Sequence, residues 1–501
     1  MVISKQETIS TAFKILRKNM NLFFVQMAIV ACSAQTKECN TPTTCSFNRT
    51  GPFCGQCEKD HFVNLNNKCV HNSKCSTRSQ HIFWSSFLSI PVAIALLLTF
   101  ANDMKLLAVR LALKMACCCS RLNRSQDHAV RPREINIGRS SINQKEISLS
   151  AIFNNVMTFF QLKALITVKG ATSDDNHAFL DQIFNIEWVA EGRKEFENLC
   201  PFYDMTVIHR MFMMGYLNPI TMVLTLLFCL LTCKLLNIIR SVLRSENFNA
   251  GRFYVGYYIV LAFSYKNICQ TAFSFTNCKT MNGKLFLYID GSIECFQPWQ
   301  IANLIFLVSW VFPFPLAVAI GYHKLKNREI SRFRLIMFLT FPSVALVMMS
   351  CKKFIKTESR HLHEKADERL VEMFELPYKE QYIWWEAWRL MERFIIAGLS
   401  VFLTNPIYRI LYITSLFALF CQLHRRVNPY KRSMFILKRL DAFSWVCLFL
   451  LSLLNEMRAI VYIYDIQKVD SIYYALRASN ILEQIFSPIW YFIVALFMTL
   501  F

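Results

Sequence analysis

Apolar segments long enough to cross a lipid bilayer recur along this chain from residue 82 to residue 501. A helix needs about 20 apolar residues to span the hydrocarbon core of a membrane. The segments are 82–100, 148–168, 211–233, 253–275, 300–322, 383–403, 407–423, 441–464 and 481–501. We therefore expect an all-α polytopic membrane protein with about nine transmembrane helices, in which residues 81–501 form the membrane domain.

Positive charge lies mainly in the loops between these segments, and the formal net charge is +21. With nine spans every basic loop falls on one side, which the positive-inside rule makes cytoplasmic. Residues 101–147 and 323–382 are then cytoplasmic loops, and anionic inner-leaflet lipids are the expected partners of the basic residues. The shorter apolar run 335–350 has basic flanks on both sides, so we expect an interfacial or re-entrant helix there. No nucleic-acid-binding motif accompanies the charge, so we expect no nucleic-acid partner.

The amino-terminal region has the organisation of a secretory signal peptide over residues 1–34. Basic residues precede an apolar run at 20–31, and small residues follow it before Gln35. An uncleaved anchor is the alternative, although the run would be short for a span. The signal predicts the plasma membrane or another secretory-pathway membrane, with the amino terminus outside or lumenal.

Six cysteines gather in residues 35–80, a stretch too small to build its own hydrophobic core. They are Cys39, Cys45, Cys54, Cys57, Cys69 and Cys75. The Cys54–Cys57 spacing would also suit zinc, but the signal peptide and the glycosylation sequon at Asn48 indicate an oxidising exterior, where disulfides are favoured. Spacing does not choose among the 15 pairings that six cysteines allow. Among the loop cysteines Cys200, Cys278 and Cys295, the pair Cys278–Cys295 closes the shortest loop and is the expected disulfide.

Two loops carry further unusual composition. The adjacent Cys117, Cys118 and Cys119 follow a segment expected to lie along the inner membrane surface, and they are candidates for palmitoylation or simply reduced cysteines. The outer loop 169–200 is rich in acidic residues and would concentrate cations at a channel mouth, or would be an ordinary solvated loop.

The segment 383–403 differs from the other spans because its first half is charged. On a helix Glu386, Arg389, Glu392 and Arg393 fall within an arc of about 120°. Charge is costly in hydrocarbon, so this face needs a polar groove. The expected polar partners are Asn155, Lys163, Lys266, Asn267 and Gln270. Alternatively, the charged side chains reach the membrane interface and pair with each other.

Motifs for familiar enzyme chemistry are missing from the sequence. There is no glycine-rich phosphate loop, no His-Glu-x-x-His and no Gly-x-Ser-x-Gly. We expect no enzyme, no cofactor and no metal site, with an intramembrane enzyme using Glu386 and Glu392 as the open alternative.

Several motifs together resemble one loose family of eukaryotic multi-pass membrane proteins. The first is Asn-Arg-Thr-Gly-Pro-Phe-Cys-Gly-Gln-Cys at 48–57, which is similar to the core of a laminin-type EGF-like module. The others are the three loop cysteines, the segment 382–393 and Asn-Pro-Tyr at 428–430. The resemblance implies an extracellular cysteine-rich glycoprotein module on a TRP-like body, and with it cation permeation and a homo-oligomer. Two alternatives stay open: a receptor or adhesion protein that binds an extracellular protein through the cysteine module, and a transporter, for which no inverted repeat is evident.

Overall fold

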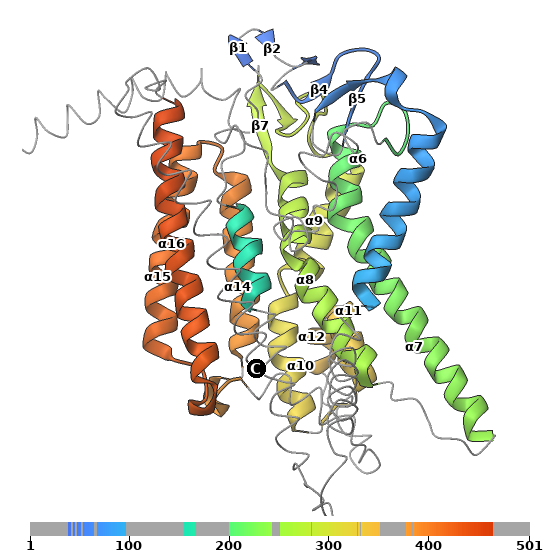
Figure 1. Ribbon diagram of the computed structural model, residues 1–501, viewed down its shortest axis with the longest axis vertical. Helices are drawn as coiled ribbons and strands as arrows, with labels where there is room; N and C mark the ends of the chain where they lie inside the picture. The colour runs from blue at the N-terminus through green and yellow to red at the C-terminus, as the bar shows by residue number, and fades with distance from the viewer. Residues whose placement is uncertain are drawn as a thin grey trace, which may run out of the picture.

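The computed structural model shows a mostly helical chain whose short β-strands gather at one end of a helical bundle (Figure 1). It describes residues 39–41, 44–45, 48–51, 54–64, 68–96, 155–165, 200–242, 251–281, 283–327, 329–330, 332–350, 377–382 and 384–463. The signal peptide expected at 1–34, the cysteines at 117–119, nearly all of the acidic loop and the ninth expected span lie outside the described residues.

Four helices within the described ranges are long and apolar enough to cross a membrane: Thr77–Leu96, Val207–Leu236, Pro298–Lys326 and Ile407–Val427. Only 28% to 39% of their most apolar stretches is buried by the rest of the protein. Their remaining apolar surface is what a helix presents to lipid. The chain is therefore membrane-embedded, while the full count of nine spans stays a prediction.

The centre of the bundle is more polar than its periphery. Helix α8 (Gly251–Thr276) packs against α7 (Asn218–Val242) on one side and against α14 (Trp385–Phe402) on the other. On the far side of α14, α15 (Pro406–Val427) and α16 (Phe435–Ile463) form a close pair (Figure 1). Polar residues of α8 and α14 are thus screened from lipid by their neighbours, which explains how a helix with four charges fits inside a membrane protein.

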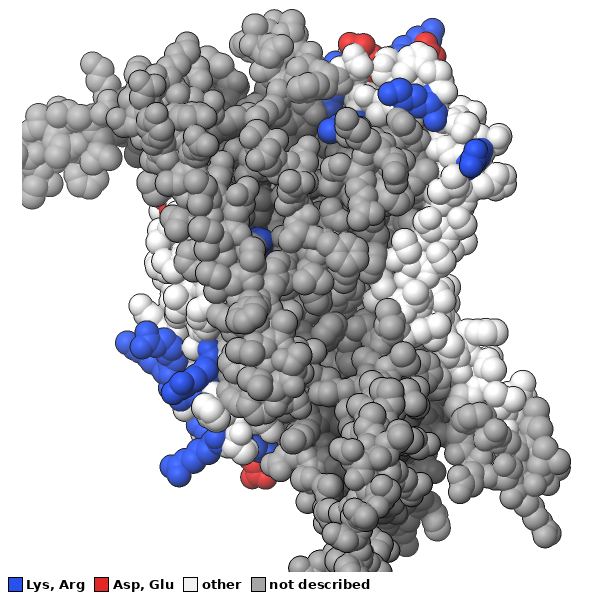
Figure 2. Space-filling model, in the orientation of Figure 1, with Lys and Arg blue, Asp and Glu red and all other residues white. Residues whose placement is uncertain are grey.

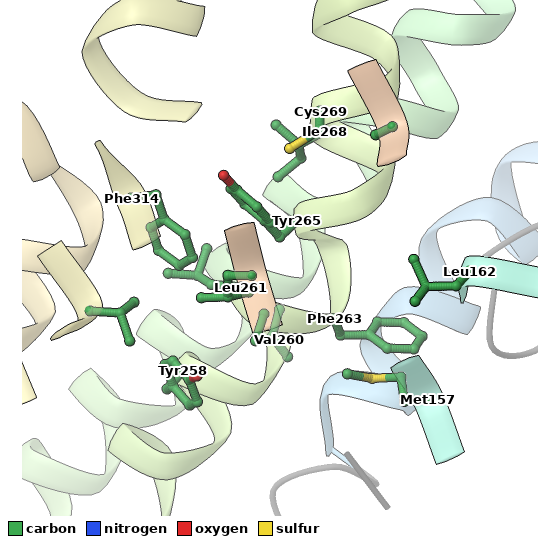
Figure 3. Packing of buried hydrophobic residues seen from close by; sticks show 14 of the residues in the cluster. Met157, Leu162, Tyr258, Val260, Leu261, Phe263, Tyr265, Ile268, Cys269 and Phe314 are labelled. Carbon is green, nitrogen blue, oxygen red and sulfur yellow. The ribbon is translucent and has the colours of Figure 1, made fainter. Parts of the chain in front are cut away.

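Large side chains of α8 pack in two directions. Figure 3 shows Phe263 directed toward Met157 and Leu162 of the helix at 155–165. Tyr265 stacks on Phe314, with ring centroids 5.1 Å apart. Helix α8 is therefore the element around which the other helices are placed.

Two of the long helices contain a wide, π-helical turn close to proline. The first comprises α6 (Val207–Phe212), η3 (Met213–Leu217) and α7, with Pro219 at the second position of α7. The second comprises α9 (Pro298–Phe306), η4 (Leu307–Val311) and α10 (Phe314–Lys326), with Pro313 and Pro315 directly after the wide turn. Because proline lacks the N–H that an α-helical turn needs, a locally altered hydrogen-bond pattern lets the chain continue as a helix.

The apolar run at 335–350 is two short helices and not one span. Helices α11 (Arg332–Thr340) and α12 (Pro342–Ser350) meet at Phe341 and both pack against α10. At about 1.5 Å per residue neither approaches the roughly 30 Å thickness of the hydrocarbon core. This arrangement agrees with an interfacial or re-entrant segment.

The strands form two-stranded antiparallel hairpins at one end of the bundle. Those of the cysteine-rich module are β1 (Cys39–Thr41), β2 (Thr44–Cys45), β3 (Arg49–Thr50), β4 (Gln56–Cys57), β5 (His61–Val63) and β6 (Cys69–His71), followed by η2 (Asn72–Lys74). The fourth hairpin, β7 (Cys278–Met281) with β8 (Lys284–Leu287), lies between α8 and α9.

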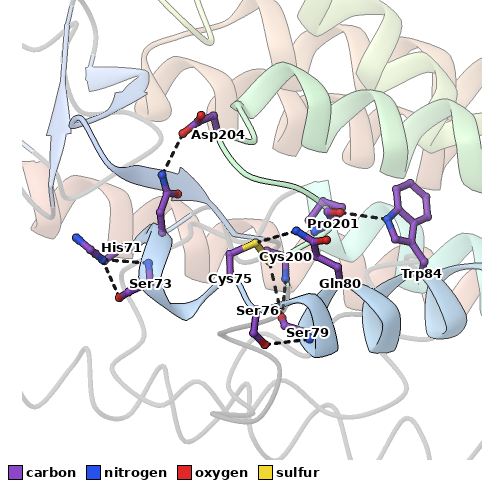
Figure 4. Close-up of a disulfide and its surroundings, with 11 residues drawn as sticks. His71, Ser73, Cys75, Ser76, Ser79, Gln80, Trp84, Cys200, Pro201 and Asp204 are labelled. Carbon is purple, nitrogen blue, oxygen red and sulfur yellow. Dashed lines mark hydrogen bonds between the residues drawn. A yellow bond between two sulfur atoms is a disulfide. The ribbon is translucent and has the colours of Figure 1, made fainter.

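The disulfides join the module to the helices, so the six cysteines of 35–80 do not all pair with one another. Cys57 pairs with Cys69 inside the module, but Cys75 pairs with Cys200, 125 residues away (Figure 4). Beside this bridge, Trp84 Nε1 donates to the Pro201 carbonyl at 3.1 Å. A further disulfide among the described residues is Cys278–Cys295, the pair expected from loop length.

Candidate functional site

The charged face of α14 is enclosed by protein. The exposed fractions are 6% for Glu386, 3% for Arg389 and 0% for both Glu392 and Arg393. Their spacing along the helix places all four on the side that faces α8, α15 and the helix at 155–165. The four side chains therefore lie in a polar groove inside the protein.

Glu386 is held by two phenols. Tyr378 donates its hydroxyl hydrogen to Glu386 Oε2 at 3.0 Å, and Tyr258 of α8 donates to Oε1 at 3.3 Å. A buried carboxylate needs such donors because it has lost the hydration that stabilises its charge.

The two arginines converge on one hydroxyl group. Arg389 Nη2 donates to Thr158 Oγ1 at 3.0 Å, and Arg393 Nη2 donates to the same oxygen. Arg393 Nη1 also donates to the Ala262 carbonyl of α8 at 2.7 Å. One face of α14 is thereby bonded to two other helices.

A histidine bridges the remaining carboxylates. His424 of α15 places Nε2 2.8 Å from Glu392 Oε1 and Nδ1 2.7 Å from Asp441 Oδ2 of α16. An ionised carboxylate only accepts hydrogen bonds, so these contacts require either an imidazolium that donates from both nitrogens or a proton on one carboxyl. With His424 charged, two arginines and one imidazolium balance the three carboxylates of Glu386, Glu392 and Asp441.

Aromatic rings exclude water from the bridging histidine. The rings of Trp385 and Trp445 each lie with their centroid 4.8 Å from that of His424, and both indoles are buried. In such a dry environment each hydrogen bond is electrostatically stronger than in water, and each unpaired charge is more costly. We call Glu386, Arg389, Glu392, Arg393, His424 and Asp441 the charge cluster.

A short antiparallel contact covers the cluster at the end of the bundle away from the strands. Tyr378 and Tyr430 form a β-bridge, Lys379 N donates to the Pro429 carbonyl at 2.8 Å, and Lys431 N donates to the Pro377 carbonyl at 3.1 Å. Asn428 ends α15 in the left-handed region with φ of 44°, a conformation that asparagine tolerates better than most residues. The Asn-Pro-Tyr motif thus turns the chain so that it covers the charged face.

The polar partners expected from the sequence are only partly in place. Asn155, Lys163 and Lys266 are buried on the two helices that face α14, whereas Asn267 and Gln270 are half-buried. The partners missed were Thr158, Tyr258, Tyr378, His424 and Asp441. His424 and Asp441 lie next to runs of lysine and arginine at the ends of their helices. From the sequence, a charged residue in such a position is expected to lie at the membrane interface, so neither was assigned to the groove.

No known protein family, curated protein or solved structure matches this chain. Among the described residues, no group of three or more His, Cys, Asp or Glu side chains could hold a metal ion. The function must therefore be inferred from the charge cluster itself.

Proposed function

We propose that this chain is a membrane protein of the channel or sensor class, TRP-like in plan, in which α14 is the moving element. The observation that carries the proposal is the charge cluster, which joins α14 to α8, α15, α16 and the helix at 155–165 inside the bundle. Buried ion pairs rarely stabilise a protein more than well-packed apolar residues would. Intramembrane charge more often marks an ion pathway, a proton relay or a voltage-sensing element.

The charge cluster holds α14 in one position relative to the neighbouring helices, and we refer to this arrangement as the latch. In the arrangement described, the charges face one another and not an open passage. A shift of α14 by one helical turn, about 5.4 Å, would part Glu392 from His424 and Arg393 from Thr158. The freed charges would then draw water between the helices, and a cation path past Glu386 would open.

The proposed orientation places the strand-bearing end outside the cell and the opposite end in the cytoplasm. Figure 2 shows lysine and arginine gathered at the two ends of the visible described surface, with uncharged surface along the helices at the right edge. The basic last turns of α10 and α15 lie at the end away from the strands, as the positive-inside rule requires of a cytoplasmic side.

A proton-coupled transporter is the second candidate, and the Glu392–His424–Asp441 chain favours it. Hydrogen bonds of 2.8 and 2.7 Å link two carboxyls through one imidazole, the pattern used to pass protons through membrane proteins. A carrier of this kind would move protons along this chain while its substrate crosses the membrane.

Flux measurements on purified full-length protein in liposomes test both candidates. Glu392→Gln keeps a hydrogen-bonding side chain but removes one charge, so it weakens the latch whatever the natural stimulus is. We expect at least tenfold greater potassium or sodium flux than in the wild type. The control is Glu380→Gln, the same change at a side chain that is 90% exposed and outside the cluster. If vesicles that contain folded wild type or folded Glu392→Gln both stay impermeable to cations, the channel proposal is wrong. If the wild type carries protons and Glu392→Gln does not, the transporter is favoured.

A further inference from the structure

A second feature, separate from the charge cluster, is a cavity of about 940 Å³ at the lipid-facing side of the bundle. Its walls come from α6, η3 and α7, from α8, and from α9 and η4. Its volume lies within the range of about 300–1,000 Å³ typical of small-molecule sites. None of the six cluster residues lines it.

The cavity is lined by flat aromatic rings and opens to the membrane. Tyr216, Phe275, Trp299 and Phe306 are among its aromatic side chains. Leu224, which also lines it, is 58% exposed, so the opening faces the region that hydrocarbon occupies in a bilayer. An occupant would therefore enter sideways from the lipid phase.

Two polar side chains of the cavity wall are already bonded to each other. Tyr216, in the wide turn η3, donates its hydroxyl hydrogen to Asn303 Oδ1 at 2.5 Å, and Asn303 Nδ2 donates to the Ala272 carbonyl of α8 at 2.9 Å. These hydrogen bonds join η3, α9 and α8 at the cavity wall. Wide turns occur on both flanking helices, and such π-helical turns are frequent at functional sites.

The charge of the lining selects among lipids. Among the described residues that line the cavity there is no lysine or arginine, so a phosphate headgroup would find no cation in this part of the wall. At the strand-bearing end the lining includes Thr206 and His209, whose Oγ1 and Nδ1 lie 3.0 Å apart, and Asp290, whose Oδ1 accepts from Ser292 at 2.6 Å. The second ring nitrogen of His209 can exchange a hydrogen bond with an uncharged hydroxyl. At the other end the Tyr257 and Thr340 hydroxyls are 2.6 Å apart and satisfy one another.

We propose that this cavity binds a neutral lipid with a flat, rigid ring system and one hydroxyl group, which is the chemistry of a sterol. The rings stack on the aromatic walls, and the hydroxyl lies at the end formed by Thr206, His209 and Asp290. The inference is independent of the proposed channel or transporter activity.

Photolabelling of the full-length protein in liposomes tests the site. A sterol carrying a photoreactive group should label peptides of α7 and α9, and unlabelled sterol should compete while phosphatidylcholine does not. Ala302→Trp fills the cavity from an exposed lining position and should lower labelling at least tenfold. Ile305→Trp places the same ring on an exposed residue of the same helix outside the lining, and should leave labelling unchanged.

Three results would overturn the proposal: labelled peptides elsewhere in the chain, equal labelling of the two tryptophan variants, or equal competition by phosphatidylcholine. The last result would identify a phospholipid tail as the occupant. If Ala302→Trp fails to fold, peptide mapping and competition on the wild type still decide the question.

Discussion

His424 links two carboxylates of the charge cluster, and no other residue of the cluster could take its place. It is the one cluster residue with two opposed nitrogens, and each faces a different carboxylate at 2.8 or 2.7 Å. Glutamine in its place can approach only one of them with a donor, so a buried carboxylate would lose its partner.

The variant His424→Gln should therefore be strongly destabilised, by about 3–5 kcal/mol, the usual cost of breaking a buried ion pair. The measurement is thermal or denaturant unfolding of the full chain in detergent. His323→Gln, at an exposed histidine of α10, is the control and should change stability by less than about 0.5 kcal/mol. A similar loss of stability in His424→Gln and His323→Gln would show that the link from His424 to the two carboxylates does not stabilise the fold.

Asp290, in the loop after β8, makes the contact between the module and the bundle sensitive to pH. Burial raises the pKa of its carboxyl above the usual range, and hydrogen bonds from Ser292 and Gln56 only partly oppose the rise. The folded protein then keeps the proton at pH values where the unfolded chain has lost it. Stability therefore falls as the pH rises from about 4 through the raised pKa.

Hydrogen exchange across this pH interval checks the effect. The amides of 54–57 and 284–290, corrected for the intrinsic rate, should become less protected as the pH rises. Asp290→Asn, which is uncharged throughout, should remove this slope and should be at least as protected as the wild type at neutral pH. Glu294→Gln, on an exposed side chain of the same hairpin region, should keep the slope. An unchanged slope in Asp290→Asn would assign the effect to other groups.

At the scale of elements, the close approach of η3 to α8 depends on a single glycine. A Cβ atom added at Gly215 would lie 1.9 Å from Thr271 Oγ1 and 2.5 Å from Thr271 Cβ. No rotation of the threonine side chain moves its Cβ away, so the helices themselves would have to separate.

Gly215→Ala should accordingly destabilise the protein by about 1–3 kcal/mol, the range seen when a packed interior receives extra atoms. Gly398→Ala in α14 is the matched control, because its new methyl would meet Phe273 at an ordinary distance of 3.4 Å. There the better helix propensity of alanine should raise stability by up to about 1 kcal/mol. Unfolding of both variants in detergent measures the contrast, and loss of stability in Gly398→Ala alone would contradict it.

The sequence predicted elements better than it predicted contacts. The charged face of α14 follows from helical spacing alone, because residues 386, 389, 392 and 393 must share a side. The ends of α8, α14 and α15 lie close to the expected ones, since apolar length sets them locally, whereas α7 and α16 extend beyond the expected apolar segments at their basic ends. Glu392 and Asp441 meet through His424, however, and Cys75 meets Cys200 across 125 residues; nothing in local pattern encodes such distant pairs.

At the scale of the whole molecule, the cysteine module and the helices share their packing. Phe62 and Cys75 of the module lie in one apolar cluster with Phe83, Cys200 and Met213. The backbone of the module also joins the bundle, since Val63 N donates to the Met205 carbonyl at 2.8 Å. Val63 of the module also lies in an apolar cluster with Val207 of α6 and Phe275 of α8, so a displacement of the module would act on both helices.

Gly55 is the closest point of this contact, and it supplies the last prediction. An added Cβ would lie 2.7 Å from Asp290 Cα and 2.8 Å from the Ile289 carbonyl oxygen. Both are backbone atoms held by the β7–β8 region, so Gly55→Ala should push the module away from the hairpin at a cost of about 1–3 kcal/mol.

Faster hydrogen exchange at 54–57 and 284–290 would report that separation. Helices α11 and α12, which lie toward the other end of the bundle (Figure 1), should exchange as in the wild type. Glu58→Ala, at an exposed position of the same module, should leave both regions unchanged. If Gly55→Ala exchanged like Glu58→Ala, the module would not rest on the hairpin in the membrane. If α14 also exchanged faster, the module would be coupled to the latch, because α8 links Asp290 to the charge cluster through its packing against α14.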